Sequence, residues 1–155
     1  MFVRTPSGRK RWNVLGALDF VSKELTMIGN TTYINSETVC ELLRKLRTEC
    51  SRLPITLVLD NASYQRCRLV QDLAEELSID LMFLPSYSPN LNLIERLWKH
   101  VKKRTLNGKY YETFDSFRET IESTLENLNT TGQNEVQTLI TRNFQLFDNQ
   151  TFLAT

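Results

Sequence analysis

The chain has 155 residues, 41% of them hydrophobic and 24% charged, with a net charge of +1, which is ordinary for one globular domain with a sizeable core. No apolar run approaches the roughly 18 residues that span a bilayer, and no apolar stretch follows the basic N-terminus, so we expect neither a membrane segment nor a secretory signal. Three cysteines without CxxC spacing, Cys40, Cys50 and Cys67, predict reduced thiols in a cytoplasmic protein.

The first half of the chain predicts a hairpin, a helix and a strand. Two apolar runs, 11–20 and 25–30, are joined by a short polar connection and indicate an antiparallel β-hairpin. A helix should begin at Ser36, because one apolar stripe follows at helical spacing: Val39, Leu42, Leu43 and Leu46. The run "LPITLVLD", closed by Asp60, predicts a fully buried central strand.

The second half alternates helix and strand and then becomes helical. A helix is expected from about Ser63, with four inward-facing residues, Leu69, Val70, Leu73 and Leu77. "IDLMFLP" predicts a second buried strand that stops at Pro85, and the helix after the next loop carries Glu95. Two further helices are marked by Phe114, Phe117, Ile121, Leu125 and Leu128 and by Val136, Leu139, Ile140 and Phe144. The order β-β-α-β-α-β-α-α-α predicts a layered α/β fold.

The basic residues are unevenly distributed. Nine of the 19 lie in two short segments: Arg4, Arg9, Lys10 and Arg11, and Arg96, Lys99, Lys102, Lys103 and Arg104. Many of the balancing acids lie in 112–126. This separation suggests a local basic face on a neutral protein, although two solvated charge runs would give the same pattern.

Two acids are candidates for chemistry, and each has a plainer explanation. Asp60 ends the most buried strand, and sites in open α/β sheets collect beyond such ends; alternatively "DNAS" caps the next helix. Glu95 lies three residues after Asn92, at the spacing of a capping box. The box does not explain the rigid loop before it, in which Pro85 and Pro89 restrict the backbone and fix where the helix starts.

The pair of acids is more informative than either acid alone. The thirty-four residues 61–94 leave room for one helix, one strand and one loop, so Asp60 and Glu95 could converge on one hard divalent cation. Mg²⁺ takes one or two carboxylates and leaves room for substrate phosphates. Lys99, with Lys102 or Lys103, could then hold a polyanion whose phosphate reaches the metal.

The same segments resemble the catalytic signature of bacterial insertion-sequence transposases of the mariner-like superfamily. In that family the second aspartate opens a "DNA" tripeptide, as Asp60, Asn61 and Ala62 do here. Its glutamate lies in "LPxYSPxLNxIExxW", which Leu84 through Trp98 match at every fixed position. The spacing of the two acids is also typical of the family. The resemblance covers nearly the whole chain, being strongest over 54–104 and weakest after about residue 130.

The resemblance implies a ribonuclease-H-like fold and metal-dependent DNA cleavage and strand transfer by a DDE triad, two aspartates and a glutamate. Asp60 and Glu95 would be ligands of two Mg²⁺ or Mn²⁺ ions roughly 4 Å apart. The DNA partners would be the element's terminal inverted repeats and the target DNA, bound by a homo-oligomer in the active assembly. The DNA contacts are expected from Arg96, Lys99, Lys102, Lys103 and Arg104. Trp98 should pack beneath the site, and Asn61 and Tyr87 could either support the site or serve the structure.

In the family, the first aspartate lies on the first, central strand, upstream of the segment that "PSGRKRWNVLGALDF" resembles, and a helix-turn-helix lies further upstream. We therefore expect a C-terminal part: residues 1–130 as a partial catalytic domain without its first strand, and 131–155 as its helical tail. Asp19 matches a hairpin position rather than the first catalytic one. Without the central strand, either stability is marginal or the hairpin pairs directly with the strand that ends at Asp60.

Other functions remain open at this point. The fragment could be a non-catalytic remnant that binds DNA or inhibits an intact transposase. A phosphate-binding regulatory domain would need a glycine-rich loop, which "GALDF" and "IGN" do not supply. The lone histidine, His100, is interpreted as an exposed member of the basic helix.

Overall fold

The computed structural model describes residues 2–4, 10–86 and 92–141, which form two small sheets and five helices. The first sheet has the order β1-β2-β3 and is antiparallel, and the second pairs β4 with β5 in parallel. The elements are β1 (Phe2–Arg4), β2 (Arg11–Leu18), β3 (Leu25–Asn30), α1 (Ser36–Glu49), β4 (Ile55–Leu59), α2 (Arg68–Glu76), β5 (Ile79–Phe83), α3 (Leu93–Leu106), α4 (Phe114–Asn129) and α5 (Gln133–Thr141). The predicted element order is confirmed from the hairpin onward.

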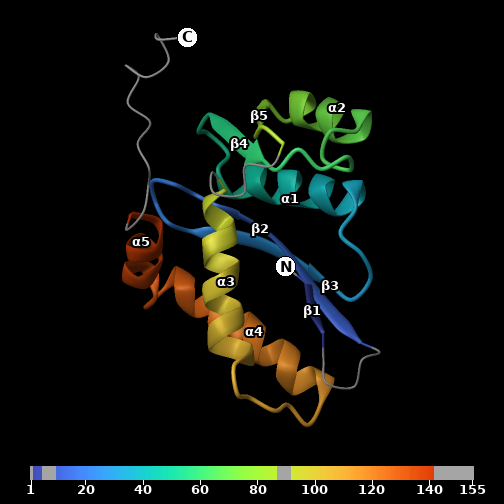
Figure 1. Ribbon diagram of the computed structural model, residues 1–155. Coiled ribbons are helices and arrows are strands. Elements are labelled where there is room, and N and C mark those ends of the chain that lie inside the picture. Colours follow the sequence, from blue (N-terminus) through green and yellow to red (C-terminus); the bar gives the residue numbers. More distant parts are fainter. Residues whose placement is uncertain (1, 5–9, 87–91, 142–155) are drawn as a thin grey trace, which may run out of the picture.

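The hairpin lies in the middle of the molecule, with helices above and below it (Figure 1). One apolar cluster joins β2 and β3 to α3, α4 and α5, and it contains Trp12, Trp98, Phe117 and Leu125. A second cluster joins β4 and β5 to α1 and α2. The predicted stripes of α1, α4 and α5 are buried, apart from the half-buried Phe114 and Leu139; Phe144 lies outside the described residues.

Helix α1 begins at Ser36 as predicted, but its N-cap is the residue before. The Asn35 side chain accepts a hydrogen bond from the Thr38 amide at 3.0 Å, and the Thr38 hydroxyl accepts one from the Asn35 amide at 3.4 Å. This closes a capping box. At its other end, the Arg47 guanidinium donates to the carbonyls of Cys50, Leu53, Leu77 and Ser78, so α1 is fixed to the segments that lead into β4 and β5.

Helix α2 differs from the prediction in its start and in one inward residue. Residues 62–66 form a turn, in which the Gln65 amide donates to the Ala62 carbonyl, and the helix begins at Arg68. The inward stripe consists of Val70, Leu73, Ala74 and Leu77, whereas Leu69 is 54% exposed. Leu69 and Val70 are neighbours, and a helix cannot turn both to the same face.

The predicted burial of β4 and β5 is half wrong. Ile55 and Leu57 and their partners on β5, Ile79 and Leu81, pack in the second cluster, and Leu59 at the next alternate position is buried. The other face stays in solvent, where the paired residues Val58 and Met82 are 46% and 55% exposed. Both strands therefore have the half-buried alternation of a one-sided sheet.

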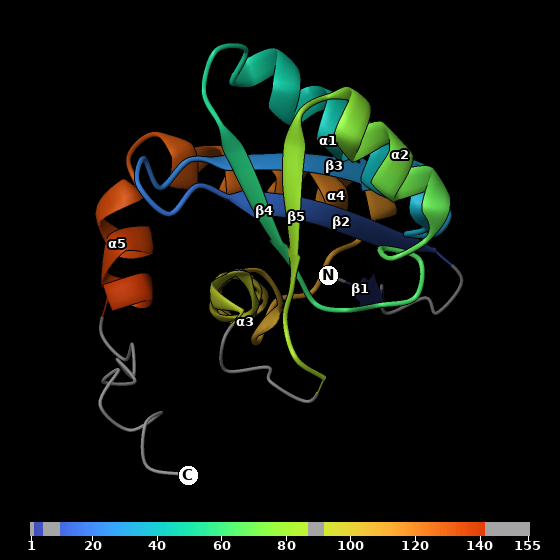
Figure 2. The ribbon, with the colours of Figure 1, turned by 90° about the horizontal axis from the view of Figure 1, so that it is seen from above.

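Of the two expected consequences of a missing central strand, direct pairing of the hairpin with β4 is wrong, and the other, marginal stability, stays a prediction. In the described ranges, β4 pairs with β5, and β2 pairs with β1 and β3. In Figure 2, β4 and β5 run across the direction of β2 and β3. The two sheets instead meet through side chains of α1, because Leu42 and Leu46 pack with Ala17 of β2 and with Ile55 and Leu57 of β4. Strand β4 is thus positioned by packing rather than by a continuous hydrogen-bond ladder.

Candidate active site

Asp60 is held where β4 ends. It directly follows the strand and its side chain is exposed. The Leu84 amide donates to the Leu59 carbonyl at 2.8 Å, so the chain leaving β5 stays beside this end of the sheet. Asn61 has a φ of 49°, in the left-handed region that asparagine tolerates, and its side-chain amide donates to the Ser86 hydroxyl at 3.3 Å. The Leu59 backbone and the Asn61 side chain, on either side of Asp60, are thereby hydrogen-bonded to the segment that follows β5.

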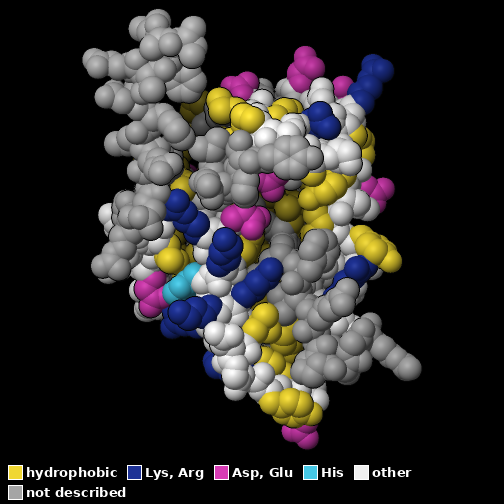
Figure 3. Space-filling model, viewed as in Figure 1, with side chains coloured by type: hydrophobic (Ala, Val, Ile, Leu, Met, Phe, Trp, Pro, Cys, Tyr) yellow, Lys and Arg dark blue, Asp and Glu magenta, His cyan; other side chains and the backbone are white. Residues whose placement is uncertain are grey.

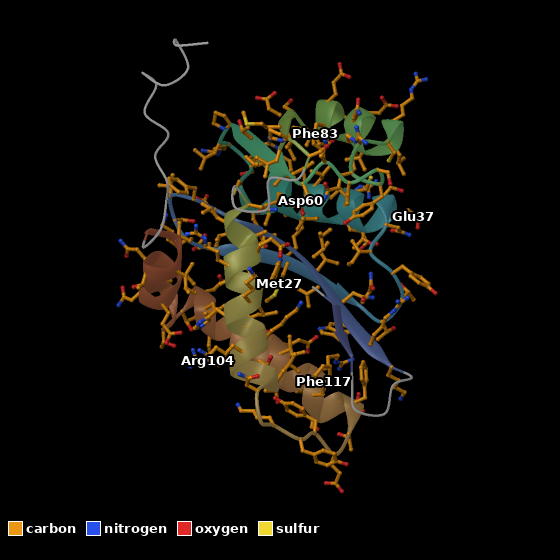
Figure 4. The ribbon with its side chains drawn as sticks, in the orientation of Figure 1. Met27, Glu37, Asp60, Phe83, Arg104 and Phe117 are labelled. Atoms are coloured by element: carbon orange, nitrogen blue, oxygen red, sulfur yellow. The ribbon has the colours of Figure 1, made fainter. Side chains whose placement is uncertain are left out.

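Asn92 connects Asp60 to helix α3. Its side-chain oxygen accepts a hydrogen bond from the Ile94 amide at 3.3 Å, which makes it the N-cap of the helix. Its side-chain amide donates to Asp60 Oδ1. One side chain therefore joins the end of β4 to the start of α3, and Figure 4 shows Asp60 beside the upper end of that helix.

Glu95 lies in the first turn of α3 with its side chain exposed. Its backbone amide donates to the Asn92 carbonyl at 3.2 Å. A carboxylate in the first turn is stabilised by the unsatisfied amides and the dipole at the helix N-terminus. The cap bond goes to Ile94, one residue before the position that a capping box uses, so the helix start is fixed through Asn92 and the side-chain oxygens of Glu95 point to solvent-accessible space.

The pKa of Tyr64 is affected by the charge of Asp60. Burial raises the pKa of the Tyr64 phenol, and the negative charge of the Asp60 carboxylate raises this pKa further.

The basic residues of α3 differ in exposure and in pairing. Lys99 and Lys103 are exposed, and Arg96 and Lys102 are half-buried. Arg104 is exposed but forms an ion pair with Glu135 of α5, with 2.7 Å between Nη1 and Oε2. Figure 3 shows Lys and Arg side chains over α3, below acidic side chains at the upper end of the helix.

Three further predicted residues have clear positions. His100 is wrongly predicted as exposed: its side chain is 28% exposed, and Nε2 lies 3.4 Å from Glu135 Oε2. Trp98 is buried, as expected for a packing residue, and its ring lies against Gly16. The Asp19 side chain accepts hydrogen bonds from the amides of Val21 and Ser22, so it closes the hairpin turn. Tyr87 and Pro89 lie outside the described residues.

Sequence reasoning proposed Asp60 and Glu95 as site residues but did not predict the contacts that hold them. The cap at Asn92 was recognisable from its type and position, whereas its bond to Asp60 spans two elements that no local pattern connects. The same holds for the bond between Asn61 and Ser86. The excess of asparagine around both acids was the available signal, since asparagine combines a donor and an acceptor in one side chain.

The chain is similar in sequence to a protein of an insertion element. The 39 kDa protein of insertion element IS630 from Shigella sonnei is 30% identical over 99 residues, which are 63% of this chain and 29% of that protein. The chain thus spans less than a third of the length of this curated relative.

Solved structures show the same fold at low sequence identity. The catalytic domain of Mos1 transposase has a TM-score of 0.70 at 15% identity, over 92% of this chain and 76% of that chain. The catalytic core domain of BIV integrase has a TM-score of 0.57 at 17% identity, over 84% and 80%. The fold is therefore the ribonuclease-H-like fold of transposase and integrase catalytic domains, as predicted. The family model of the DDE superfamily endonucleases matches residues 2–118, and the chain belongs to that family.

Proposed function

We propose that this chain is part of the catalytic domain of a DNA transposase and that it acts in metal-dependent strand cleavage and strand transfer. The observation that carries the proposal is the junction at Asn92, which brings the end of β4, with Asp60, to the start of α3, with Glu95. Family membership supports the reaction class, because a DDE endonuclease breaks phosphodiester bonds.

The donor set fits a hard divalent cation. Asp60 and Glu95 offer exposed carboxylate oxygens, which Mg²⁺ and Mn²⁺ prefer, and solvent and a DNA phosphate can complete the coordination. A bound ion supplies Lewis acidity and an activated oxygen nucleophile. In the part of the chain that the structure describes, no group of three or more Asp, Glu, His or Cys side chains could hold a metal, so a two-ion site would need further ligands. The similar Mos1 structures include one with Mg and one with Mn.

The basic side chains of α3 would hold the DNA strand. From Glu95 to Lys103 the helix advances about 12 Å, at 1.5 Å per residue. That length matches about three to four steps of a DNA strand. Lys99 and Lys103 lie one turn apart on the exposed side, and Arg96 and Lys102 flank them. Arg104 would contribute less because Glu135 already pairs with it. The substrates would be element ends and target DNA, in a homo-oligomer, and one Mos1 structure is a paired-end complex with a transposon end.

A non-catalytic DNA-binding or transposase-inhibiting role is the second candidate. It is favoured by the presence of two acids, rather than three, at the described site. The two candidates differ in what they require of Glu95: a catalyst needs its charge to bind metal, whereas a binder has no use for a carboxylate near the phosphates.

The test compares retention and nicking of DNA by the wild-type chain and by the variants Asp60→Asn, Glu95→Gln and Lys99→Glu/Lys103→Glu, with Mn²⁺ present. If the chain is catalytic, each acid variant loses nicking by about 100-fold or more, since a metal supplies several kcal/mol of transition-state stabilisation, but retains DNA. The lysine variant should lose retention and lower the salt dependence by about two counterions.

Two results would change the conclusion. Retention without nicking by the wild-type chain, with no loss or a slight gain in Glu95→Gln, supports the binding role. Equal retention by the lysine variant at every salt concentration contradicts DNA contact through α3.

A further inference from the structure

We propose that Asn92 is the positioning residue for Asp60, and that divalent-metal binding depends on the Asn92 amide. This inference rests on the proposed metal role of Asp60. Asn92 uses both ends of its side chain: the oxygen caps α3 through Ile94, and the amide donates to Asp60 Oδ1.

The cap alone does not require asparagine. Serine, threonine and aspartate accept the same bond from a helix amide. Asn35 shows the simple case in the same chain, because it caps α1 through Thr38 and lies at a helix start that carries no candidate ligand pair. At position 92 the side chain accepts from one group and donates to a carboxylate, and asparagine carries the acceptor and the donor on two separate atoms, whereas serine and threonine have one hydroxyl oxygen for both.

The hydrogen bond has a direct consequence for the carboxylate. Asp60 is exposed and follows the last residue of β4, so without a partner its side chain would rotate among several conformations. The Asn92 amide engages Oδ1 and leaves Oδ2 for a cation. Because the same residue begins α3, the orientation of Asp60 is coupled to the position of Glu95 three residues later.

Two further hydrogen bonds hold the residues on either side of Asp60 in place. Leu59 accepts from Leu84, and Asn61 donates to Ser86, so the two residues flanking Asp60 are each bound to the segment after β5. With Asn92, three hydrogen bonds connect 59–61 to 84–92. The bond from Leu84 to Leu59 joins the two backbones, the bond from Asn61 to Ser86 joins two side chains, and the bond from Asn92 fixes where the carboxylate points.

The test measures Mn²⁺ binding to the full chain by the electron paramagnetic resonance signal of free Mn²⁺. It compares the wild-type chain with Asn92→Ser, Asp60→Asn and the matched control Asn35→Ser, in which a different helix cap undergoes the same substitution. Serine keeps either cap but is too short to reach Asp60. We expect Asn92→Ser to raise the Kd by about 10- to 100-fold, the usual effect of removing a group that orients a metal ligand. Asn35→Ser should leave the Kd unchanged, and both serine variants should melt within a few degrees of each other.

The outcomes separate this inference from the proposed function. Wild-type-like binding by Asn92→Ser, together with weak binding by Asp60→Asn, overturns the positioning role and leaves the metal site intact. If the wild-type chain binds no Mn²⁺, or if Asp60→Asn binds Mn²⁺ as tightly as the wild type, both the positioning role of Asn92 and the metal role of Asp60 are overturned. If Asn92→Ser does not fold, Asn92→Thr takes its place, since threonine also caps.

A second measurement needs no metal. In the ¹⁵N-labelled chain, the side-chain amide resonances of Asn92 should shift and exchange faster with solvent in Asp60→Ala, while those of Asn35 stay unchanged. Unchanged Asn92 resonances would contradict the bond.

Discussion

At the scale of single residues, Tyr64 offers a check on where the Asp60 carboxylate lies. Two causes raise the pKa of its phenol: burial, which is the larger, and the charge of Asp60. A phenol whose pKa is raised in the folded state stabilises the fold below its unfolded value, about 10, and this contribution is lost as the pH rises beyond that value. Stability should therefore decline in strongly alkaline solution.

We predict that Asp60→Asn lowers the pKa of Tyr64 but leaves it above the ordinary tyrosine value. The substitution removes the charge and keeps the burial, which is the larger cause. A titration of the tyrosine ring carbons by NMR measures the change, with Tyr64→Phe to assign the signal. Tyr33 and Tyr110, which are exposed, serve as internal controls. An unchanged Tyr64 titration would mean that the carboxylate does not face the phenol.

The sequence predicted the two acids because each has a local signature. Asp60 closes an apolar run, and Glu95 follows a cap residue and a rigid loop. The partners of these residues depend on which elements become neighbours, and that follows from the tertiary packing. For this reason the bond from Asn92 to Asp60 and the approach of His100 to Glu135 became visible in the structure rather than in the pattern.

At the scale of elements, one side chain attaches helix α4 to the hairpin. The oxygen of Asn129, the last residue of α4, accepts from the Leu25 amide at 2.7 Å, and its amide donates to the Leu25 carbonyl at 2.9 Å. Asn129 thus pairs with the first residue of β3 as a neighbouring strand would. Leu25 is buried, so its backbone groups need these partners.

We expect Asn129→Asp to destabilise the protein by about 1–3 kcal/mol. Aspartate keeps the shape but cannot donate to the Leu25 carbonyl, which is left unsatisfied and faces a charge. Urea unfolding followed by circular dichroism measures the loss. Asn127→Asp, an exposed position on the same helix, is the matched control and should stay within about 0.5 kcal/mol of the wild type. Equal stability of the two variants would show that the bidentate contact contributes nothing.

The elements that the sequence predicted best are the ones whose apolar stripe is unambiguous. Helix α4 has four buried residues at helical spacing, and its bounds follow from them. Strand β4 was harder, because a continuous apolar run does not reveal whether the rest of the chain covers both faces. The described chain covers the face with Leu57 and leaves Val58 and Met82 in solvent.

At the scale of the whole molecule, α1 joins two halves that share no strand pairing in the described ranges. One half contains the hairpin with α3, α4 and α5, and the other contains β4, β5 and α2. The cluster formed by Ala17, Leu42 and Leu46 contacts residues of both sheets. Both tryptophans, Trp12 and Trp98, lie in the half that contains the hairpin, in its cluster with α3, α4 and α5. Tryptophan fluorescence therefore reports one half, whereas circular dichroism reports all helices.

This arrangement predicts that weakening the packing of α1 between the two sheets separates the unfolding transitions seen by tryptophan fluorescence and by circular dichroism. Leu42→Ala should cost about 2–5 kcal/mol, the usual effect of truncating a buried leucine. Because the lost packing lies between the sheets, the half containing β4, β5 and α2 should unfold first in urea, so circular dichroism should change at a lower concentration than tryptophan fluorescence. Leu125→Ala truncates an equally buried leucine inside the cluster that contains both tryptophans, and there fluorescence should not lag. Coincident transitions in Leu42→Ala would mean that the halves still unfold as one cooperative unit, and that contacts besides those of α1 couple the two sheets.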